Sequence, residues 1–336
     1  MRIKRVVFPD KGICVVEETD LDENLGENEV LVRNRRTLVS AGTELAMFTK
    51  IHRGFTTPGN TYARYPFYPG YSAVGDVVKT NPASGVGPIR TGDTVAYSGK
   101  HSTYSRSGEM VGCLKVAPGP DAELEVYTFA SLLTTALTSL HLAPIRPGEN
   151  VLVVGLGIVG NLAAQLYRAA GAGVVAGADF SAPRIQIARK TGAVDIAFNL
   201  KERPLPEWLP QLGTPGAELV VDAVGLKASI QSCIAAVARR GRLVLLGSPR
   251  EKMEIDPYND IHSRGVQIIG AHTGVVDSAV RMRDRAFVAG ALRDGRVRVK
   301  DLITQHMDLA DAPAAYAGLR DKPDEYVGVI FRYPVA

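Results

Sequence analysis

The chain has 336 residues, of which 46% are apolar and 22% charged, with a mean hydropathy of +0.02 and a net charge of +4. This ordinary globular composition disfavours fibrous, disordered and membrane proteins, and without a long Lys/Arg run a nucleic-acid role has little support. Only three cysteines occur, far apart, which excludes a disulfide framework and a four-thiolate zinc cluster.

The first 120 residues are predicted to be rich in short strands. The start of the chain is interpreted as a strand and not a signal peptide, and no apolar run is long enough for a membrane span, so a cytoplasmic location is expected. Turn-forming residues separate the runs, which suggests a small barrel or sandwich. The predicted strands are Ile3–Phe8, Ile13–Glu17, Glu29–Arg33, Ala73–Lys79, Thr94–Tyr97 and Met110–Val116.

The stretch Ile51–Pro69 interrupts this pattern with five aromatic residues and no clear period. A long aromatic loop inside a compact domain is typical of a lid or a substrate wall. The alternative is a loop that packs its own rings into a satellite core, and the sequence favours neither.

From about residue 122 the pattern changes to helix and strand in alternation, after a helix-like stretch at Leu124–Leu142. Continuous apolar runs are typical of strands buried on both faces, and the alternation predicts right-handed βαβ units and a parallel sheet. The predicted strands are Val151–Val154, Val174–Ala178, Asp195–Phe198, Leu219–Val224, Arg242–Leu246 and Gln267–Ile269, with helices at Asn161–Ala170, Ala182–Lys190 and Lys227–Ala236.

After Gly270 the alternation stops. One helix is predicted at Asp277–Asp294, followed by a strand at Leu302–Thr304 and a helix at Ala312–Leu319. A closing strand at Val327–Tyr333 could rejoin the N-terminal β-rich part.

The strongest motif follows the run Val151–Val154 directly and opens a helix. It reads Gly155-Leu156-Gly157-Ile158-Val159-Gly160. The first glycine permits a tight turn, the second lets the backbone approach a pyrophosphate, and the third lets the helix pack on the strand. The helix N-terminus offers N–H groups and a positive dipole end to the phosphates. The motif therefore predicts a dinucleotide site with Gly155, Gly157, Ile158, Val159 and Gly160 in contact with the cofactor, the alternative being a purely structural turn.

Asp179 ends the next predicted strand, 19 residues beyond Gly160. A carboxylate there can accept hydrogen bonds from the ribose hydroxyls and would repel a 2′-phosphate, which favours NAD over NADP. Arg184, five residues further on, is a mild counter-argument because it could face a phosphate or the adenine. The alternative role for Asp179 is a cap for the helix that starts near Ser181.

The chain resembles the medium-chain dehydrogenase/reductase family over nearly its full length. Besides the glycine motif, the matches include the runs Gly92–Val95, Pro69–Gly70, Val74–Val78 and Gly192–Ala193. The resemblance implies an α/β fold: a doubly wound Rossmann domain at residues 123–275, plus a GroES-like β-barrel catalytic domain at 1–122 and 276–336. It also implies a homodimer, formed through the exposed sheet edge at Val266–Gly270.

The sequence departs from this family at the positions that hold its catalytic zinc. Ala41 stands where the thiolate would be, and Tyr71 stands where the imidazole would be. Neither residue is a normal zinc ligand, so we expect no zinc and a proton transfer carried by side chains. The pair of motifs around these residues is similar to zinc-lacking members, among them the dehydrogenase of bacteriochlorophyll synthesis and dehydrogenases of sugars and cyclitols.

Four residues are candidates for the chemistry: Thr43, Glu44, Tyr71 and His101. The resemblance implies that the Thr43 hydroxyl contacts the substrate oxygen; the alternative is a hydroxyl bonded to the backbone of a local turn. It implies that Glu44 is an acid just outside the ligands of the metal position; the alternative is a carboxylate that stabilises a helix N-terminus. Tyr71 would fill the vacated metal site, unless it is only a packed ring. His101, as a histidine, is a candidate general base, the alternative being a solvated loop residue. At the carboxyl edge of the sheet, Gly247 and His272 are expected near the nicotinamide.

Three functions remain open at this stage. The favoured one is a metal-independent, NAD-dependent dehydrogenase of a secondary alcohol in a sugar, cyclitol or other hydroxylated metabolite. The second is a zinc-free NAD(P)H-dependent quinone or enoyl reductase, which Asp179 disfavours. The third is an NAD-binding module without catalysis, for which only the missing zinc ligands argue.

Overall fold

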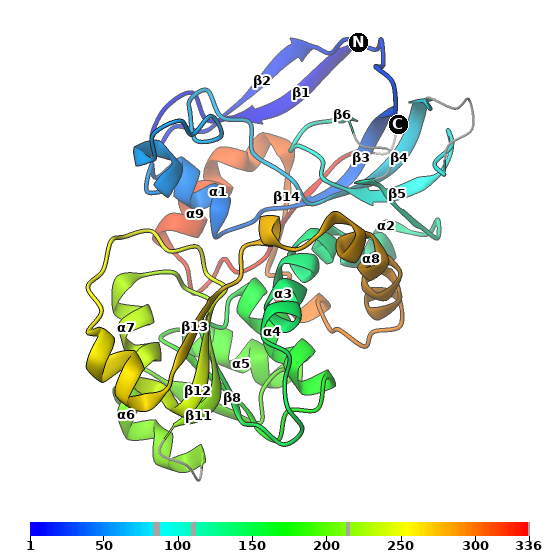
Figure 1. Cartoon of the computed structure of the whole chain (residues 1–336). Helices are drawn as coiled ribbons and strands as arrows, with labels where there is room; N and C mark the ends of the chain where they lie inside the picture. Colours follow the sequence, from blue (N-terminus) through cyan, green and yellow to red (C-terminus); the bar gives the residue numbers. More distant parts are fainter. Residues whose placement is uncertain (83–87, 109–111, 213–215, 335–336) are drawn as a thin grey trace. The chain divides into compact units, whose positions relative to one another are not determined.

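The computed structural model describes residues 1–82, 88–108, 112–212 and 216–334 (Figure 1). These residues form two compact units: Met1–Ser131 with Arg285–Ala336, and Leu132–Asp284. In the described ranges, no helix combines the length and the apolar character that crossing a bilayer requires.

The first unit is built on a mixed sheet. In its described part the strand order is β14-β15-β3-β4-β5-β7, and β6 also pairs with β3. Strand β15 pairs antiparallel with β3, with Ile330 opposite Leu38, which confirms that the closing strand rejoins the N-terminal part. The strands are β3 (Glu29–Leu38), β4 (Ala73–Asn81), β5 (Thr94–Tyr97), β6 (Tyr104–Ser107), β7 (Leu114–Val116), β14 (Gln305–Asp308) and β15 (Val329–Arg332).

A hairpin of β1 (Arg2–Val7) and β2 (Val15–Asp20) and the helices α1 (Thr43–Phe48) and α9 (Ala312–Asp321) complete this unit. Aromatic rings form its core: the centroid of Phe8 lies 4.7 Å from that of Tyr316 and 5.4 Å from that of Phe48, both edge to face. The stretch Ile51–Pro69 is divided. Phe67 is buried in this core, whereas Tyr62 is 49% exposed.

The second unit contains a parallel sheet whose strand order, in the described residues, is β10-β9-β8-β11-β12-β13. Figure 1 shows α6 and α7 on one face of this sheet and α4 and α5 on the other, which is the predicted doubly wound α/β arrangement. The bounds are β8 (Val151–Val154), α4 (Ile158–Ala169), β9 (Val175–Asp179), α5 (Ala182–Lys190), β10 (Ile196–Asn199), α6 (Leu205–Trp208), β11 (Ala217–Asp222), α7 (Lys227–Ala236), β12 (Val237–Leu245) and β13 (Gln267–Gly270). Helix α8 (Ser278–Arg293) begins in this unit and ends in the first.

The differences between predicted and observed elements have local causes. The strand predicted at Leu302–Thr304 is wrong: Lys300–Leu302 is a short helical turn, and β14 starts at Gln305. This strand lies at the sheet edge and its residues are mostly polar, so it lacks the apolar pattern of a buried strand. The helix predicted at Leu124–Leu142 is interrupted, with α2 (Asp121–Leu124), a 3-10 turn and α3 (Ala130–Leu142) in succession. The start of the strand predicted at Met110–Val116 lies outside the described residues.

Candidate active site

The glycine loop of the second unit is fixed by close backbone packing. Gly155 has φ +91°, which is the left-handed region that favours glycine, and a Cβ on Gly160 would lie 1.8 Å from the Gly155 carbonyl oxygen. A Cβ on Gly157, by contrast, would meet no atom of the described chain within 4 Å. The loop is therefore packed tightly at both ends and open at its middle residue, where the predicted pyrophosphate would lie.

Helix α4 begins inside the glycine motif, at Ile158, with Gly157 as its N-cap residue and no capping side chain among the described residues. The N–H groups of Ile158 and Val159 in its first turn have no helical partner by construction. Such a helix start attracts anions through its N–H groups and its dipole. These residues fit the phosphates of a dinucleotide.

Asp179 at the end of β9 holds the glycine loop in place. One carboxylate oxygen accepts a hydrogen bond from the N–H of Leu156 at 2.7 Å, and the other accepts one from the N–H of Ser181 at 2.8 Å. Each carboxylate oxygen has two lone pairs, so further acceptor capacity remains for ribose hydroxyls. The helix cap is Ser181, whose hydroxyl accepts from the N–H of Arg184 at 3.4 Å.

Asp222, which the sequence reasoning did not single out, organises the neighbouring loops. Its carboxylate accepts hydrogen bonds from the Gly225 N–H at 2.9 Å and from the Ser229 hydroxyl, and its carbonyl accepts from the Gly247 N–H at 2.7 Å. Burial raises the pKa of Asp222, and the hydrogen bonds from Ser229 and Gly225 to its carboxylate oppose the shift. The signal that could have found it is an acid at the carboxyl end of a buried parallel strand.

Gly247 and His272 lie beyond the carboxyl ends of β12 and β13. A Cβ on Gly247 would be 2.6 Å from the backbone nitrogens of Gly225 and Val224, so only glycine lets the two loops meet. His272 is exposed, and its Nδ1 accepts a hydrogen bond from the Gly274 N–H at 3.0 Å. Their contacts with a nicotinamide stay a prediction.

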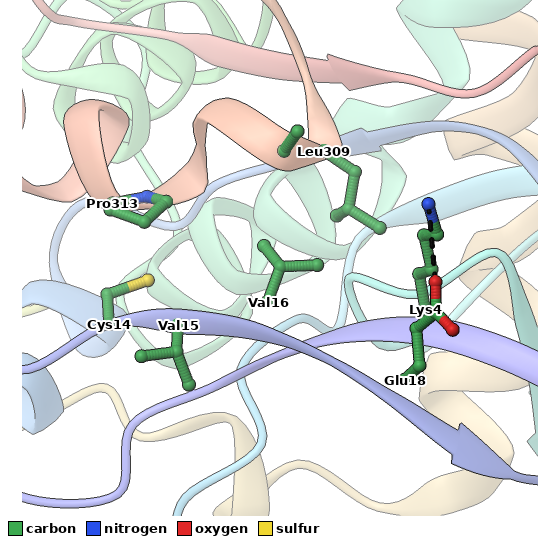
Figure 2. A pocket seen from close by; sticks show the side chains of 8 residues that line it. Lys4, Cys14, Val15, Val16, Glu18, Leu309 and Pro313 are labelled. Carbon is green, nitrogen blue, oxygen red and sulfur yellow. Dashed lines mark ion pairs between the residues drawn. The ribbon is translucent and has the colours of Figure 1, made fainter.

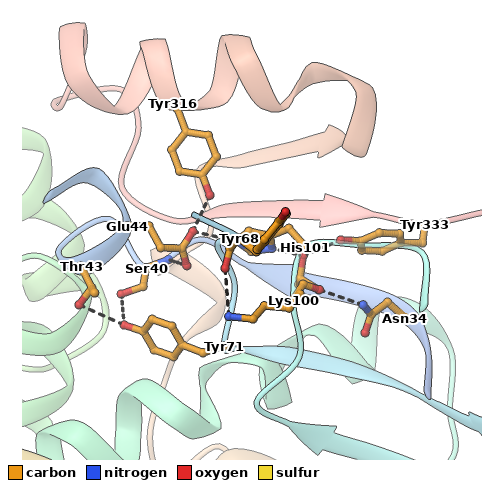
Figure 3. A network of polar contacts seen from close by, with 11 residues as sticks. Asn34, Ser40, Thr43, Glu44, Tyr68, Tyr71, Lys100, His101, Tyr316 and Tyr333 are labelled. Carbon is orange, nitrogen blue, oxygen red and sulfur yellow. Dashed lines mark hydrogen bonds and ion pairs between the residues drawn. The ribbon is translucent and has the colours of Figure 1, made fainter. Parts of the chain in front are cut away.

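In the first unit, three hydroxyl groups gather where the sequence departs from the zinc-dependent pattern (Figure 3). The Tyr71 hydroxyl donates a short hydrogen bond to Ser40 Oγ and lies 3.5 Å from Thr43 Oγ1. Burial raises the pKa of Tyr71, the Ser40 and Thr43 hydroxyls lower it, and the negative charge of Glu44 raises it further. Tyr71 is therefore a neutral phenol near neutral pH; its single O–H can donate to a substrate oxygen only by leaving Ser40 Oγ.

Glu44 and His101 form a buried pair behind this cluster. Glu44 Oε2 lies 2.9 Å from His101 Nε2 and accepts a hydrogen bond from the Tyr316 hydroxyl, while Glu44 Oε1 accepts from the Ser40 N–H at 3.1 Å. Both side chains of the pair are essentially inaccessible to solvent. The other nitrogen of the imidazole, Nδ1, lies 2.7 Å from Thr37 Oγ1. His101 thus uses both ring nitrogens internally.

The predicted residues Thr43, Glu44, Tyr71 and His101 consequently lie in one polar network. Three members were not predicted: Ser40, Thr37 and Tyr316. Ser40 directly precedes Ala41 in the sequence, so its place near Tyr71 could have been predicted from the position of Ala41. Tyr316 is 272 positions from Glu44 in the sequence, and no local sequence pattern predicts their contact.

The donor set at this place does not fit a zinc ion. Ala41 has no donor atom, the Tyr71 hydroxyl is bonded to Ser40, and the Glu44 carboxylate is occupied by three hydrogen bonds. In the part of the chain that the structure describes, no three His, Cys, Asp or Glu side chains come close enough to hold a metal ion. Zinc sites in proteins need three or four such ligands.

A hollow of about 420 Å³ lies elsewhere in the first unit, between the β1–β2 hairpin and α9 (Figure 2). It is lined by Cys14, Val16, Leu309 and an exposed Lys4–Glu18 ion pair at 3.5 Å. Burial, and then the charge of Glu44, raises the pKa of the Cys14 thiol to about 12. A thiol that stays protonated is a poor nucleophile, so this hollow adds no reactive group to the site.

Comparison with known proteins defines the class of the chain. Residues 159–286 match the family model of the zinc-binding dehydrogenases. An alcohol dehydrogenase from Geobacillus stearothermophilus is 30% identical over 269 residues, which cover 68% of this chain and 76% of that protein.

Solved structures share the fold. Galactitol-1-phosphate dehydrogenase from Escherichia coli superposes with a TM-score of 0.83 at 20% identity, over 98% of this chain and 100% of the other. A protein from Sinorhizobium meliloti 1021, described as a zinc-binding dehydrogenase and bound to NADP, superposes with a TM-score of 0.82 at 20% identity, over 99% and 100% of the chains. The chain belongs to the medium-chain, zinc-binding-type dehydrogenase superfamily. It is accordingly an oxidoreductase of the medium-chain alcohol dehydrogenase type.

Proposed function

We propose that this enzyme oxidises a secondary alcohol of a sugar, polyol, cyclitol or other hydroxylated compound, with NAD as hydride acceptor and without a metal ion. The observation that carries the proposal is the cluster of Tyr71, Ser40 and Thr43 hydroxyls at the position of the family's zinc ligands. The relatives named above include an alcohol dehydrogenase and a dehydrogenase of a phosphorylated polyol, which supports this class of substrate.

The cofactor would supply the hydride acceptor, and the chain's own residues would bind and orient it. The N–H groups of Ile158 and Val159 would bind the pyrophosphate next to Gly157, which has no side chain to block its approach. Asp179 would accept hydrogen bonds from the ribose hydroxyls. Because its carboxylate repels a 2′-phosphate, we propose NAD, although one structural neighbour binds NADP. Arg184 is the residue that could weaken this preference.

We assign the substrate oxygen to the hydroxyl cluster. Tyr71 and Thr43 would hold the reacting hydroxyl by hydrogen bonds, which replace the polarisation that a Lewis acid provides in zinc enzymes. As the hydride of the carbinol C–H passes to NAD, the hydroxyl proton would leave through these side-chain hydroxyls to water. Glu44 and His101 act as positioning residues, since they fix the Ser40 backbone and α1 from inside the unit. A preorganised set of donors that stabilises developing charge contributes about 100-fold or more to a rate.

The experiment that tests this proposal is a cofactor and substrate panel. Purified enzyme is assayed by NADH or NADPH absorbance with polyols, cyclitols and sugars in the oxidative direction and with quinones and enones in the reductive direction. We expect alcohol oxidation with kcat/KM at least about tenfold higher for NAD than for NADP, which corresponds to about 1.4 kcal/mol. Enone or quinone turnover with NADPH and no alcohol oxidation would replace the proposal with the reductase function.

We further propose a homodimer through the exposed edge of β13. Gln267 and Gly270 are exposed, Ile268 and Ile269 are half-buried, and the strand pairs with β12 on its inner side. An unpaired strand edge is a template for a symmetry-related strand. Light scattering coupled to size exclusion should give twice the chain mass, and Ile269→Lys should halve it. A wild-type monomer would contradict the proposal.

A further inference from the structure

The segment that surrounds Tyr71 in the sequence has an unusual charge pattern. From Leu45 to Gly75 there is no Asp or Glu, but there are three permanent cations, Lys50, Arg53 and Arg64. This one stretch therefore carries a charge of +3, whereas the whole chain has a net charge of only +4. Clefts lined by one sign of charge concentrate ligands of the opposite sign.

Lys100 adds a fourth cation next to the hydroxyl cluster. The backbone around Lys100 packs against the backbone just before Tyr71. A Cβ on Gly70 would lie 2.8 Å from Lys100 Cα, and the His101 N–H donates to the Pro69 carbonyl at 3.1 Å. Lys100 Nζ donates a hydrogen bond to the Tyr68 carbonyl at 3.0 Å, and Figure 3 shows its side chain beside Tyr71 and Tyr68.

The ammonium group of Lys100 has donors to spare. It is exposed, and within the described residues it forms no ion pair with a carboxylate of the chain. An ammonium group has three donors, and the bond to Tyr68 uses one. Partial burial lowers the pKa of Lys100, and the charge of Glu44 opposes that shift. A bound anion would stabilise the charged form of Lys100, because it would offset the effect of burial.

Aromatic rings connect this cation with the hydroxyl cluster. Lys100 Nζ lies 5.9 Å from the centroid of Phe67, whose ring is 5.6 Å from that of Tyr62. Burial raises the pKa of Tyr62 to about 12, and the charges of Tyr71 and Glu44 add to the shift. Tyr62 is 49% exposed, so its ring can border a bound molecule.

We infer that the substrate of this enzyme carries an anionic group, a carboxylate or a phosphate, which Lys100 binds while the ring of Tyr62, packed edge to face on the buried Phe67, borders the carbon skeleton. This inference rests on the proposed alcohol oxidation and narrows its substrate class. Lys50, Arg53 and Arg64 add a positive field that attracts the anion.

The test uses three compounds with related skeletons: glucitol, glucitol 6-phosphate and gluconate. The whole enzyme is assayed with NAD, and binding of the same compounds to enzyme saturated with NADH is measured by calorimetry. The variants are Lys100→Gln and Lys100→Arg. The matched control is Lys79→Gln, because Lys79 is also exposed and its Nζ also donates to one carbonyl, that of Glu23 at 2.9 Å.

We expect the phosphate, the carboxylate or both to have a KM or Kd at least about tenfold below that of glucitol, as a charge-assisted hydrogen bond provides. Lys100→Gln should abolish this preference with little change in kcat, Lys100→Arg should retain most of it, and Lys79→Gln should change nothing. The two anions distinguish a carboxylate site from a phosphate site.

Equal or tighter binding of glucitol would overturn the inference, and so would no binding of either anion or equal effects of the Lys100 and Lys79 variants. The proposed function fails separately. Anion binding that depends on Lys100 without any NAD reduction would support the anion site and reject the proposed dehydrogenase function. NAD-dependent alcohol oxidation without a preference for anionic substrates would support the dehydrogenase function and reject the anion site.

Discussion

The two candidate sites differ in how the chain builds them. The dinucleotide site uses the backbone of six consecutive residues, Gly155–Gly160, and the acid Asp179 a short distance later. The hydroxyl network uses side chains from Thr37 to Tyr316, spread over most of the first unit. A backbone site is encoded locally because glycine is required at fixed positions. A side-chain site depends on contacts that only the complete fold creates, so local sequence indicates its members one at a time.

The largest expected effect is on stability, and it tests whether the network is a buried structure. His101 with Glu44 and His306 with Glu125 are two His–Glu pairs in the same unit, both at 2.9 Å, of which the first is buried and the second 41% and 13% exposed. His101→Ala should cost about 2–4 kcal/mol of unfolding free energy, because it removes one of the three hydrogen bonds to the buried Glu44 carboxylate and leaves a cavity. His306→Ala should cost about 1 kcal/mol or less. Urea denaturation measures both, and equal losses would refute the assigned role of burial.

Tyr71→Phe tests whether the hydroxyl cluster is chemical and not only packed. The variant should lower kcat by about 100-fold, with NAD affinity and thermal stability nearly unchanged, because one hydrogen-bond donor to the substrate oxygen is lost. Tyr65→Phe is the matched control, since the Tyr65 hydroxyl donates to the Met47 carbonyl inside the unit. Steady-state kinetics and cofactor titration separate the two effects. A Tyr71→Phe enzyme with full kcat would remove Tyr71 from the site.

Two glycines of one loop test the backbone site. Gly160→Ala should destabilise the unit by about 1–3 kcal/mol and weaken NAD binding, because its Cβ would collide with the Gly155 carbonyl. Gly157→Ala should leave stability unchanged, since its Cβ meets no protein atom, but should still weaken NAD binding by filling the space of the pyrophosphate. Thermal melts and NADH fluorescence titration give both quantities. Normal NAD affinity in Gly157→Ala would place the phosphates elsewhere.

The smallest expected effect concerns cofactor choice. Asp179→Asn keeps an acceptor for Leu156 or Ser181 but removes the charge that repels a 2′-phosphate, so the preference for NAD over NADP should fall by about tenfold, or about 1.4 kcal/mol. Asp195→Asn is the control, because Asp195 likewise accepts from a backbone N–H, that of Val175 at 2.9 Å. The measurement is the ratio of kcat/KM for the two cofactors. Equal ratios in all three enzymes would assign the selection to other residues.

The same contrast explains what the sequence could predict. The buried strand Val151–Val154 and the glycine motif were predictable, since their patterns arise from local burial and backbone geometry. The edge strand β14 was missed because its exposed polar residues carry no apolar period. Tyr316 and Asp222 were missed for different reasons: Tyr316 reaches Glu44 only through the packing of α9, whereas Asp222 looked like the end of an ordinary strand.

The central claim is that side-chain hydroxyls do the work of the family's zinc. The direct measurement is the rate of alcohol oxidation after dialysis against a zinc chelator, with the metal content of the same sample determined by mass spectrometry. The account predicts an unchanged kcat with far less than one metal ion per chain, and no gain on adding zinc. A rate that falls with the metal content and returns with added zinc would contradict it.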